Sequence, residues 1–255
     1  MKALALFQIQ LKDILKNLQV CLLFFVFPVI GFVMSSSMQD QSSFFISVFA
    51  TMHVVFTPMM TMSTILAEQK EQKIIRNLAY AGVPSSLYLL VHGVLVCFLT
   101  CFTACLFLVF PGFSLDVIPF LTAVFTGVIL SILLGGCIAL STSSLSSSNA
   151  VVMPFAMLFS FVPMLANFNE HLDNISNILY SKQVSIMMND LHQINLLSSL
   201  ILVFTALLLI IWFYLAYHKS MNIVCHFHLR RLWFYRIGFL CIEILQKKSY
   251  PVKSP

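Results

Sequence analysis

Five long stretches of the chain carry no Asp, Glu, Lys or Arg, and they are the runs 17–39, 41–67, 77–115, 117–169 and 191–218. A helix that crosses the hydrocarbon core of a bilayer needs about 20 mostly apolar residues, so each run can supply at least one crossing. An open sheet would leave its backbone groups unpaired in lipid, and the alternation typical of a membrane β-barrel is missing. The runs therefore predict an all-α, polytopic membrane protein.

The composition of the chain is that of a membrane protein rather than of a soluble domain. Only 9% of the 255 residues are charged and 60% are hydrophobic, whereas about 25% of the residues of an ordinary soluble domain are charged. The mean hydropathy is +0.96. So few charges cannot cover a water-facing surface. This excludes an ordinary soluble enzyme, a disordered chain and a nucleic-acid binder, despite the net charge of +5.

One of the charge-free runs must contain two spans. The run 117–169 is too long for a single crossing, because a helix rises about 1.5 Å per residue. A serine-rich polar segment, residues 141–149, interrupts this run and is interpreted as a turn. The chain is therefore expected to contain six membrane-spanning helices, at about 18–34, 44–66, 87–110, 117–140, 150–168 and 198–217.

The basic residues are distributed unequally between the two sides that this topology defines. Thirteen of the fourteen Lys and Arg residues fall in the segments 1–17, 67–86 and 218–255, and only Lys182 falls on the other side. Because basic loops stay in the cytoplasm, both termini are expected to be cytoplasmic. The first apolar run is interpreted as an uncleaved span and not as a signal peptide, whose charged region would be shorter.

The segment 67–84 concentrates charge in a chain that has little of it. Five charged residues fall within nine positions: Glu68, Lys70, Glu71, Lys73 and Arg76. The surrounding residues favour helix, and Gly82 and Pro84 would end it. We therefore predict a short amphipathic helix at the membrane surface that presents these charges to a cytoplasmic partner. The alternative is a solvated connector between two spans.

The same segment resembles the connection between the second and third spans in a known family, the membrane subunits of ABC-2 type exporters. The matching residues are Ala67, Glu68, Lys70, Glu71, Leu78, Ala81, Gly82, Val83 and Tyr88. Many members of that family have Gly-Thr after the acidic pair, where this chain has Lys73-Ile74. In the family this segment is a coupling helix, so the resemblance implies that its five charged residues contact an ATPase.

The resemblance also implies how the rest of the chain is organised. Residues 1–217 would form an ABC-2 type transmembrane domain. It would have an N-terminal interfacial helix within 1–17 and outer helices within 167–197. The last part of the chain, 218–255, departs from the family and is interpreted as a basic, aromatic cytoplasmic tail on the membrane surface.

The function that the resemblance implies is that of a permease subunit of an exporter in the plasma membrane of a bacterium. Two separate ATPase subunits would bind ATP and Mg²⁺, and a second copy or a sister permease would complete the pathway. No catalytic, cofactor or metal site is expected in this chain, and it has no G-x-x-x-x-G-K-[ST] motif for holding phosphates. Spans without charges favour an amphipathic or hydrophobic substrate, such as a peptide, a lipid or a drug.

Two sets of residues inside the spans keep alternatives open. No carboxylate or lysine lies within a span, and His53 is the one histidine near the middle of one. It is either a proton relay or a neutral, hydrogen-bonded packing histidine. Cys97, Cys101 and Cys105 share one face of the third span, where they are either small hydrophobic residues or metal ligands.

Functions of other classes remain as alternatives. The outer segment 167–197 would suit a small immunity or sensor protein that binds a peptide at its outer face without transporting it. An intramembrane enzyme is disfavoured, because the spans contain neither a G-x-S-x-G nor an H-E-x-x-H pattern.

Overall fold

The computed structural model describes residues 2–80, 83–110, 113, 115–189 and 195–219. All regular structure in this part of the chain is helical, as expected. The predicted tail, 218–255, lies outside the described residues except for its first two.

The elements of the described part follow one another as helices joined by short connections. They are α1 (Lys2–Lys16), α2 (Leu18–Ser37), η1 (Gln39–Gln41), α3 (Ser42–Glu71), α4 (Ile74–Tyr80), α5 (Ser85–Ala104), η2 (Cys105–Val109), α6 (Val117–Ser141), α7 (Leu145–Ala166), α8 (Glu170–Ser176), α9 (Tyr180–Asn189) and a final helix, Leu196–Lys219. The elements η1 and η2 are 3-10 turns.

Six of these helices are long and apolar enough to cross a membrane: α2, α3, α5 together with η2, α6, α7 and the final helix. Each coincides with one predicted span, so the prediction of six apolar helices is confirmed. Most predicted boundaries differ from the observed ones by a few residues, and the second span continues to Glu71 instead of ending at 66. The third span changes from α-helix to the tighter 3-10 form at Cys105. The fifth begins at Leu145 instead of 150, because Ser144 accepts a hydrogen bond from the Ser147 N–H and caps the helix there.

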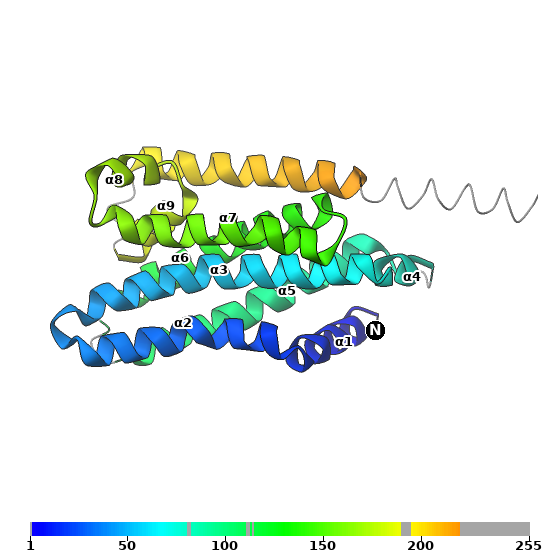
Figure 1. Ribbon diagram of the computed structural model, residues 1–255, viewed down its shortest axis with the longest axis horizontal. Helices are drawn as coiled ribbons and strands as arrows, with labels where there is room; N and C mark the ends of the chain where they lie inside the picture. The colour runs from blue at the N-terminus through cyan, green and yellow to red at the C-terminus, as the bar shows by residue number, and fades with distance from the viewer. Residues whose placement is uncertain (1, 81–82, 111–112, 114, 190–194, 220–255) are drawn as a thin grey trace, which may run out of the picture.

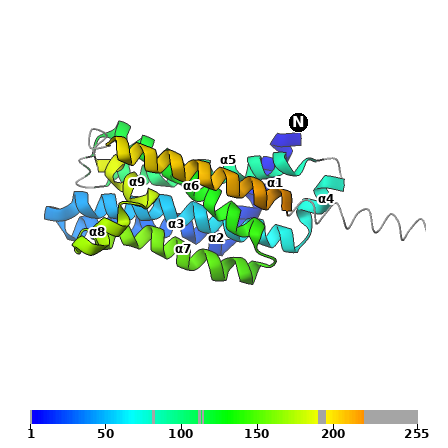
Figure 2. The same ribbon diagram turned by 90° about the horizontal axis from the view of Figure 1, so that it is seen from above.

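The long helices lie side by side along the long axis of the molecule (Figure 1). At one end lie α4 and the start of α1, and we call this the α4 end; α8 lies at the opposite end, the α8 end. The helix α3 is central, because it packs against α2, α5, α6, α7 and α9. Its apolar stretch is 78% buried, whereas that of the final helix is only 6% buried. The final helix runs along the outside of the bundle (Figure 2).

Glycines allow α6 to approach the central helix closely. A Cβ atom at Gly127 would lie 2.5 Å from Cγ1 of Val54, and a Cβ atom at Gly135 would collide with the backbone carbonyl of Met59. Helix pairs in membranes have small residues at such contacts, since they associate through close packing and not through the exclusion of water. The two glycines therefore hold α6 against α3.

Candidate functional site

The segment 67–84, predicted to be one short helix, consists of two helices in the structure. The first part of it, as far as Glu71, is the last turn of the long helix α3. The chain then turns at Gln72-Lys73 and continues as α4. The prediction of a single separate helix is therefore wrong. Helix-forming residues follow the second span without interruption, so nothing in the local sequence ends that helix at the membrane surface.

We call residues 68–77 the elbow, because α3 changes direction there at a residue with a left-handed backbone. Lys73 has φ of 62°, and its N–H donates to the Lys70 carbonyl over 3.1 Å. This is the usual way in which a helix ends, except that the left-handed position is usually taken by glycine. A side chain with a Cβ atom costs about 1–2 kcal/mol in this conformation.

The strain at Lys73 leads to a prediction about stability. We expect Lys73→Gly to stabilise the protein by about 1 kcal/mol, because glycine adopts a positive φ without the steric penalty. We expect Lys73→Val to destabilise it, since β-branched residues are genuine outliers at positive φ. Thermal unfolding of the purified chain in detergent measures both. A melting temperature that does not rise with glycine, or does not fall with valine, would contradict this account of the elbow.

Lys70 points away from solvent and binds the end of α6. Its Nζ atom donates to the carbonyl oxygens of Leu140 over 2.7 Å, of Thr142 over 2.6 Å and of Ala139 over 3.4 Å. These carbonyls belong to the last turn of α6 and to the residue after it, where no backbone N–H can reach them all. The ammonium group thus uses its three donors inside the chain, and it satisfies the end of a neighbouring helix.

The next residue, Glu71, binds the beginning of α7. Its Oε2 atom accepts a hydrogen bond from the N–H of Leu145, the first residue of that helix, over 2.7 Å. Glu68, one turn earlier, is half-buried and accepts from Nε2 of Gln72 over 3.0 Å, while Gln72 and Lys73 are exposed. Arg76 belongs to α4. The five predicted contact residues are therefore close together in the chain, but two of them are occupied by the bundle itself.

The segment that joins α6 to α7, with the first turn of α7, contacts the central helix α3, whereas the sequence interpretation treated it only as a connection. Besides the contacts to Lys70 and Glu71, its polar residues bind the central helix. The Ser148 and Ser63 hydroxyls lie 2.8 Å apart, and the Thr64 hydroxyl donates to Oδ1 of Asn149 over 3.2 Å. Polar side chains that hydrogen-bond across helices are common in membrane proteins. The serines and the asparagine within 141–149 were the sequence feature from which these hydrogen bonds could have been predicted.

His53 lies in a fully hydrogen-bonded cluster inside the bundle. Its Nε2 atom is 2.9 Å from Oγ1 of Thr103 on α5, and its Nδ1 atom is 3.2 Å from Oγ1 of Thr57. The Thr57 hydroxyl also lies 3.1 Å from the Leu23 carbonyl of α2. The ring is completely buried, and Phe107 packs beside it. Because both ring nitrogens have partners, the geometry favours the packing histidine over the proton relay.

The three cysteines of the third span lie on α5 and at the start of η2. Cys97 and Cys101 are half-buried and Cys105 is exposed. Within the ranges that the structure describes, no group of three His, Cys, Asp or Glu side chains is arranged to hold a metal ion.

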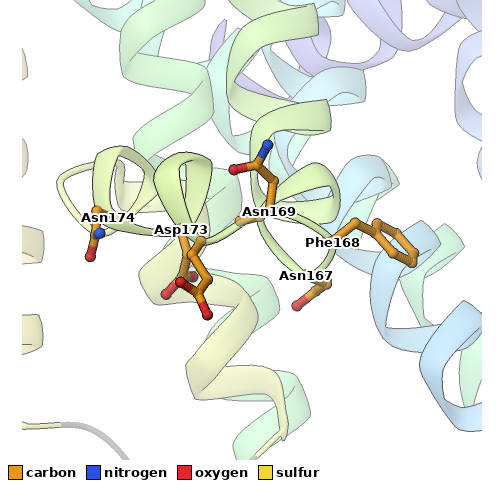
Figure 3. A pocket seen from close by; sticks show the side chains of 7 residues that line it. Asn167, Phe168, Asn169, Asp173 and Asn174 are labelled. Carbon is orange, nitrogen blue, oxygen red and sulfur yellow. The ribbon is translucent and has the colours of Figure 1, made fainter.

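A pocket opens at the α8 end, between α7 and α8 (Figure 3). Its volume is about 460 Å³, and it is lined by Ala166, Asn167, Phe168, Asn169, Glu170, Asp173 and Asn174. Asp173 also forms an ion pair with Lys182 of α9, with 3.0 Å between the charged atoms. The segment predicted as outer helices, 167–197, thus contains α8 and α9. Two of its apolar residues, Ile175 and Ile178, are exposed rather than packed.

Comparison with known proteins assigns no role to the elbow, the histidine cluster or the pocket. No protein-family model matches the chain, no curated protein matches it and no solved structure matches it.

Proposed function

We propose that this chain is the membrane subunit of an ATP-driven exporter of the ABC-2 type, and that its elbow docks on a separate ATPase. The elbow is the observation that carries the proposal. The long apolar helix α3 ends at the α4 end of the bundle, where the chain turns at Lys73 and continues into the short helix α4. An ATPase outside the membrane can move the bundle only through parts of the chain at the membrane surface, and the elbow would be one of them.

The backbone at Lys73 supports the resemblance on which this proposal depends. Many members of the family have glycine at this position, and glycine is the residue that best accepts a positive φ. Here φ is 62° although the residue is lysine. The backbone at this position thus has the conformation that the family's glycine favours, although the residue itself differs.

The contacts inside the chain divide the predicted docking residues into two groups. The first group, which we call free, is exposed Lys73 together with Glu68, which is half-buried and bonds to Gln72. Lys70 and Glu71 already bind α6 and α7, and Arg76 follows on α4. Two ATPase subunits holding ATP and Mg²⁺ would dock through the free group. A second copy of the chain, or a sister permease, would complete a pathway through a bacterial plasma membrane for an amphipathic or hydrophobic substrate.

The docking proposal is tested by reversing the free charges. The tagged chain is expressed with the ABC-type ATPases of the genome that encodes it, purified, and assayed for bound ATPase. We expect the double change Glu68→Lys and Lys73→Glu to reduce co-purification at least tenfold, because it reverses both charges offered to the partner. The control is Asp40→Lys, a charge reversal on the exposed η1 turn at the opposite end. Equal retention of ATPase by both variants would remove the elbow from the docking site.

A second function is favoured by the pocket at the α8 end. Glu170 in its lining would suit a peptide that carries a basic residue, whereas Asp173 is already paired with Lys182. In that case the chain would act as an immunity or sensor protein without an ATPase. Protection of cells against such a peptide in the absence of any ABC ATPase, together with loss of protection in Glu170→Lys, would replace the first function with this one.

A further inference from the structure

Two adjacent residues of the elbow bind two helix ends of opposite polarity. The C-terminus of α6 carries the negative end of its helix dipole and meets the positive charge of Lys70. The N-terminus of α7 carries the positive end of its dipole and meets the negative charge of Glu71. Exchange of the two residues would therefore make both contacts unfavourable, so the order Lys-Glu is matched to the order α6-α7.

These two side chains also satisfy backbone groups that have few other partners. Lys70 donates to the carbonyls of Leu140 and Thr142, and Glu71 accepts from the N–H of Leu145. The side chain of Ser144 serves a different group, the N–H of Ser147. Loss of a charged partner from such groups is unfavourable where water cannot replace it. The effect should be larger at half-buried Lys70 than at exposed Glu71.

The connection continues along α3 into the bundle. About one turn before the elbow, the adjacent residues Thr64 and Ser63 bind Asn149 and Ser148 in the first turn of α7. Elsewhere α7 is a peripheral helix: its apolar stretch is 28% buried, whereas that of α3 is 78% buried. The start of α7 therefore has its polar attachments to the same helix that carries the elbow.

We propose that Lys70 and Glu71 form a clasp through which movement of the elbow is passed to the end of α6 and the start of α7. The clasp rests on the proposed function in one respect: the force that would move the elbow is that of the docked ATPase. It assigns different tasks to neighbouring residues. Glu68 and Lys73 face the partner, and Lys70 and Glu71 hold the two membrane helices to the element that the partner moves.

The first test asks whether the two side chains hold the turn. Hydrogen–deuterium exchange of the full chain in nanodiscs is followed by mass spectrometry on peptides that cover 138–150. We expect exchange there to be about tenfold faster in Lys70→Met and about threefold faster in Glu71→Met, because local opening becomes easier when the helix ends lose their charged partners. Lys70→Arg keeps the donors and should restore protection. The control, Lys73→Met, changes an exposed neighbour and should leave the turn unchanged.

The second test asks whether strain at the elbow reaches the turn. Lys73→Val strains the elbow, and we expect it to accelerate exchange at 138–150 several-fold in the otherwise unchanged chain. In the background of Lys70→Met and Glu71→Met it should have no further effect, so the two changes should be non-additive. Additive effects, or an unchanged turn in Lys70→Met, would overturn the clasp. Neither test contains an ATPase, so a failure of docking and a failure of the clasp are seen in different experiments.

Discussion

Replacement of Gly135 by alanine is expected to destabilise the bundle by about 2 kcal/mol, because the added methyl group must push α6 away from α3. The Cβ atom would collide with the backbone carbonyl of Met59, which no rotamer change can move aside. Since α3 packs against most of the other helices, a displacement there disturbs several interfaces at once. Equilibrium unfolding in mixed micelles measures the change in free energy.

The matched control is Gly93→Ala on α5. At this glycine the nearest atom to an added Cβ is Cγ2 of Ile132 at 3.7 Å, an ordinary van der Waals distance. Alanine also favours helix over glycine by about 1 kcal/mol. We therefore expect Gly93→Ala to be neutral or stabilising. Similar losses of stability in the two variants would show that the close approach of α6 to α3 is not what makes Gly135 necessary.

The second large effect is expected at the histidine cluster. Thr103→Val removes the hydroxyl that lies 2.9 Å from Nε2 of His53, and it leaves a buried ring nitrogen without a partner. An unpaired polar group costs about 1–3 kcal/mol in a protein interior, while hydrogen bonds between membrane helices average about 0.6 kcal/mol. We expect a loss of about 1–2 kcal/mol, measured by the same unfolding assay.

Thr100→Val on the same helix provides the comparison. Thr100 is as deeply buried, but its hydroxyl donates only to the Val96 carbonyl of its own helix. That carbonyl keeps its backbone hydrogen bond when the hydroxyl is removed, so the loss should be close to zero. If Thr100→Val is as harmful as Thr103→Val, the hydrogen bond to His53 contributes nothing beyond the packing of a threonine.

Most of the fold could be predicted, since the physical rule behind it is local. A segment in lipid must satisfy its own backbone, so length and the absence of charge are enough to identify a spanning helix. The six predicted spans correspond to six apolar helices for this reason. The turn at 141–149 was predicted from its serines, but the hydrogen bonds of Ser148 and Asn149 to α3 were not. Those contacts join residues that are far apart in the sequence.

The elbow shows where prediction from local sequence ends. Gly82 and Pro84 indicated the end of the predicted helix, and α4 does end just before them, at Tyr80. The break at Glu71, with left-handed Lys73 after it, was not predicted. No glycine or proline marks that position. The charges of 68–76 were interpreted as one docking surface, because a helix that stands alone has only solvent and partners to contact. In the folded chain α6 and α7 lie beside it.

By itself, the sequence determined the class of this protein and the number of its apolar helices, through the scarcity of charge and the length of the runs without it. Only the tertiary structure decided which charges are available. Lys70 and Glu71 bind helix ends whose dipoles match them, and Glu68 and Lys73 do not. The physical reason is that a charged side chain binds within the chain only where a helix end of opposite polarity lies near it. The packing of α3 against α6 and α7 brings two such helix ends to the elbow.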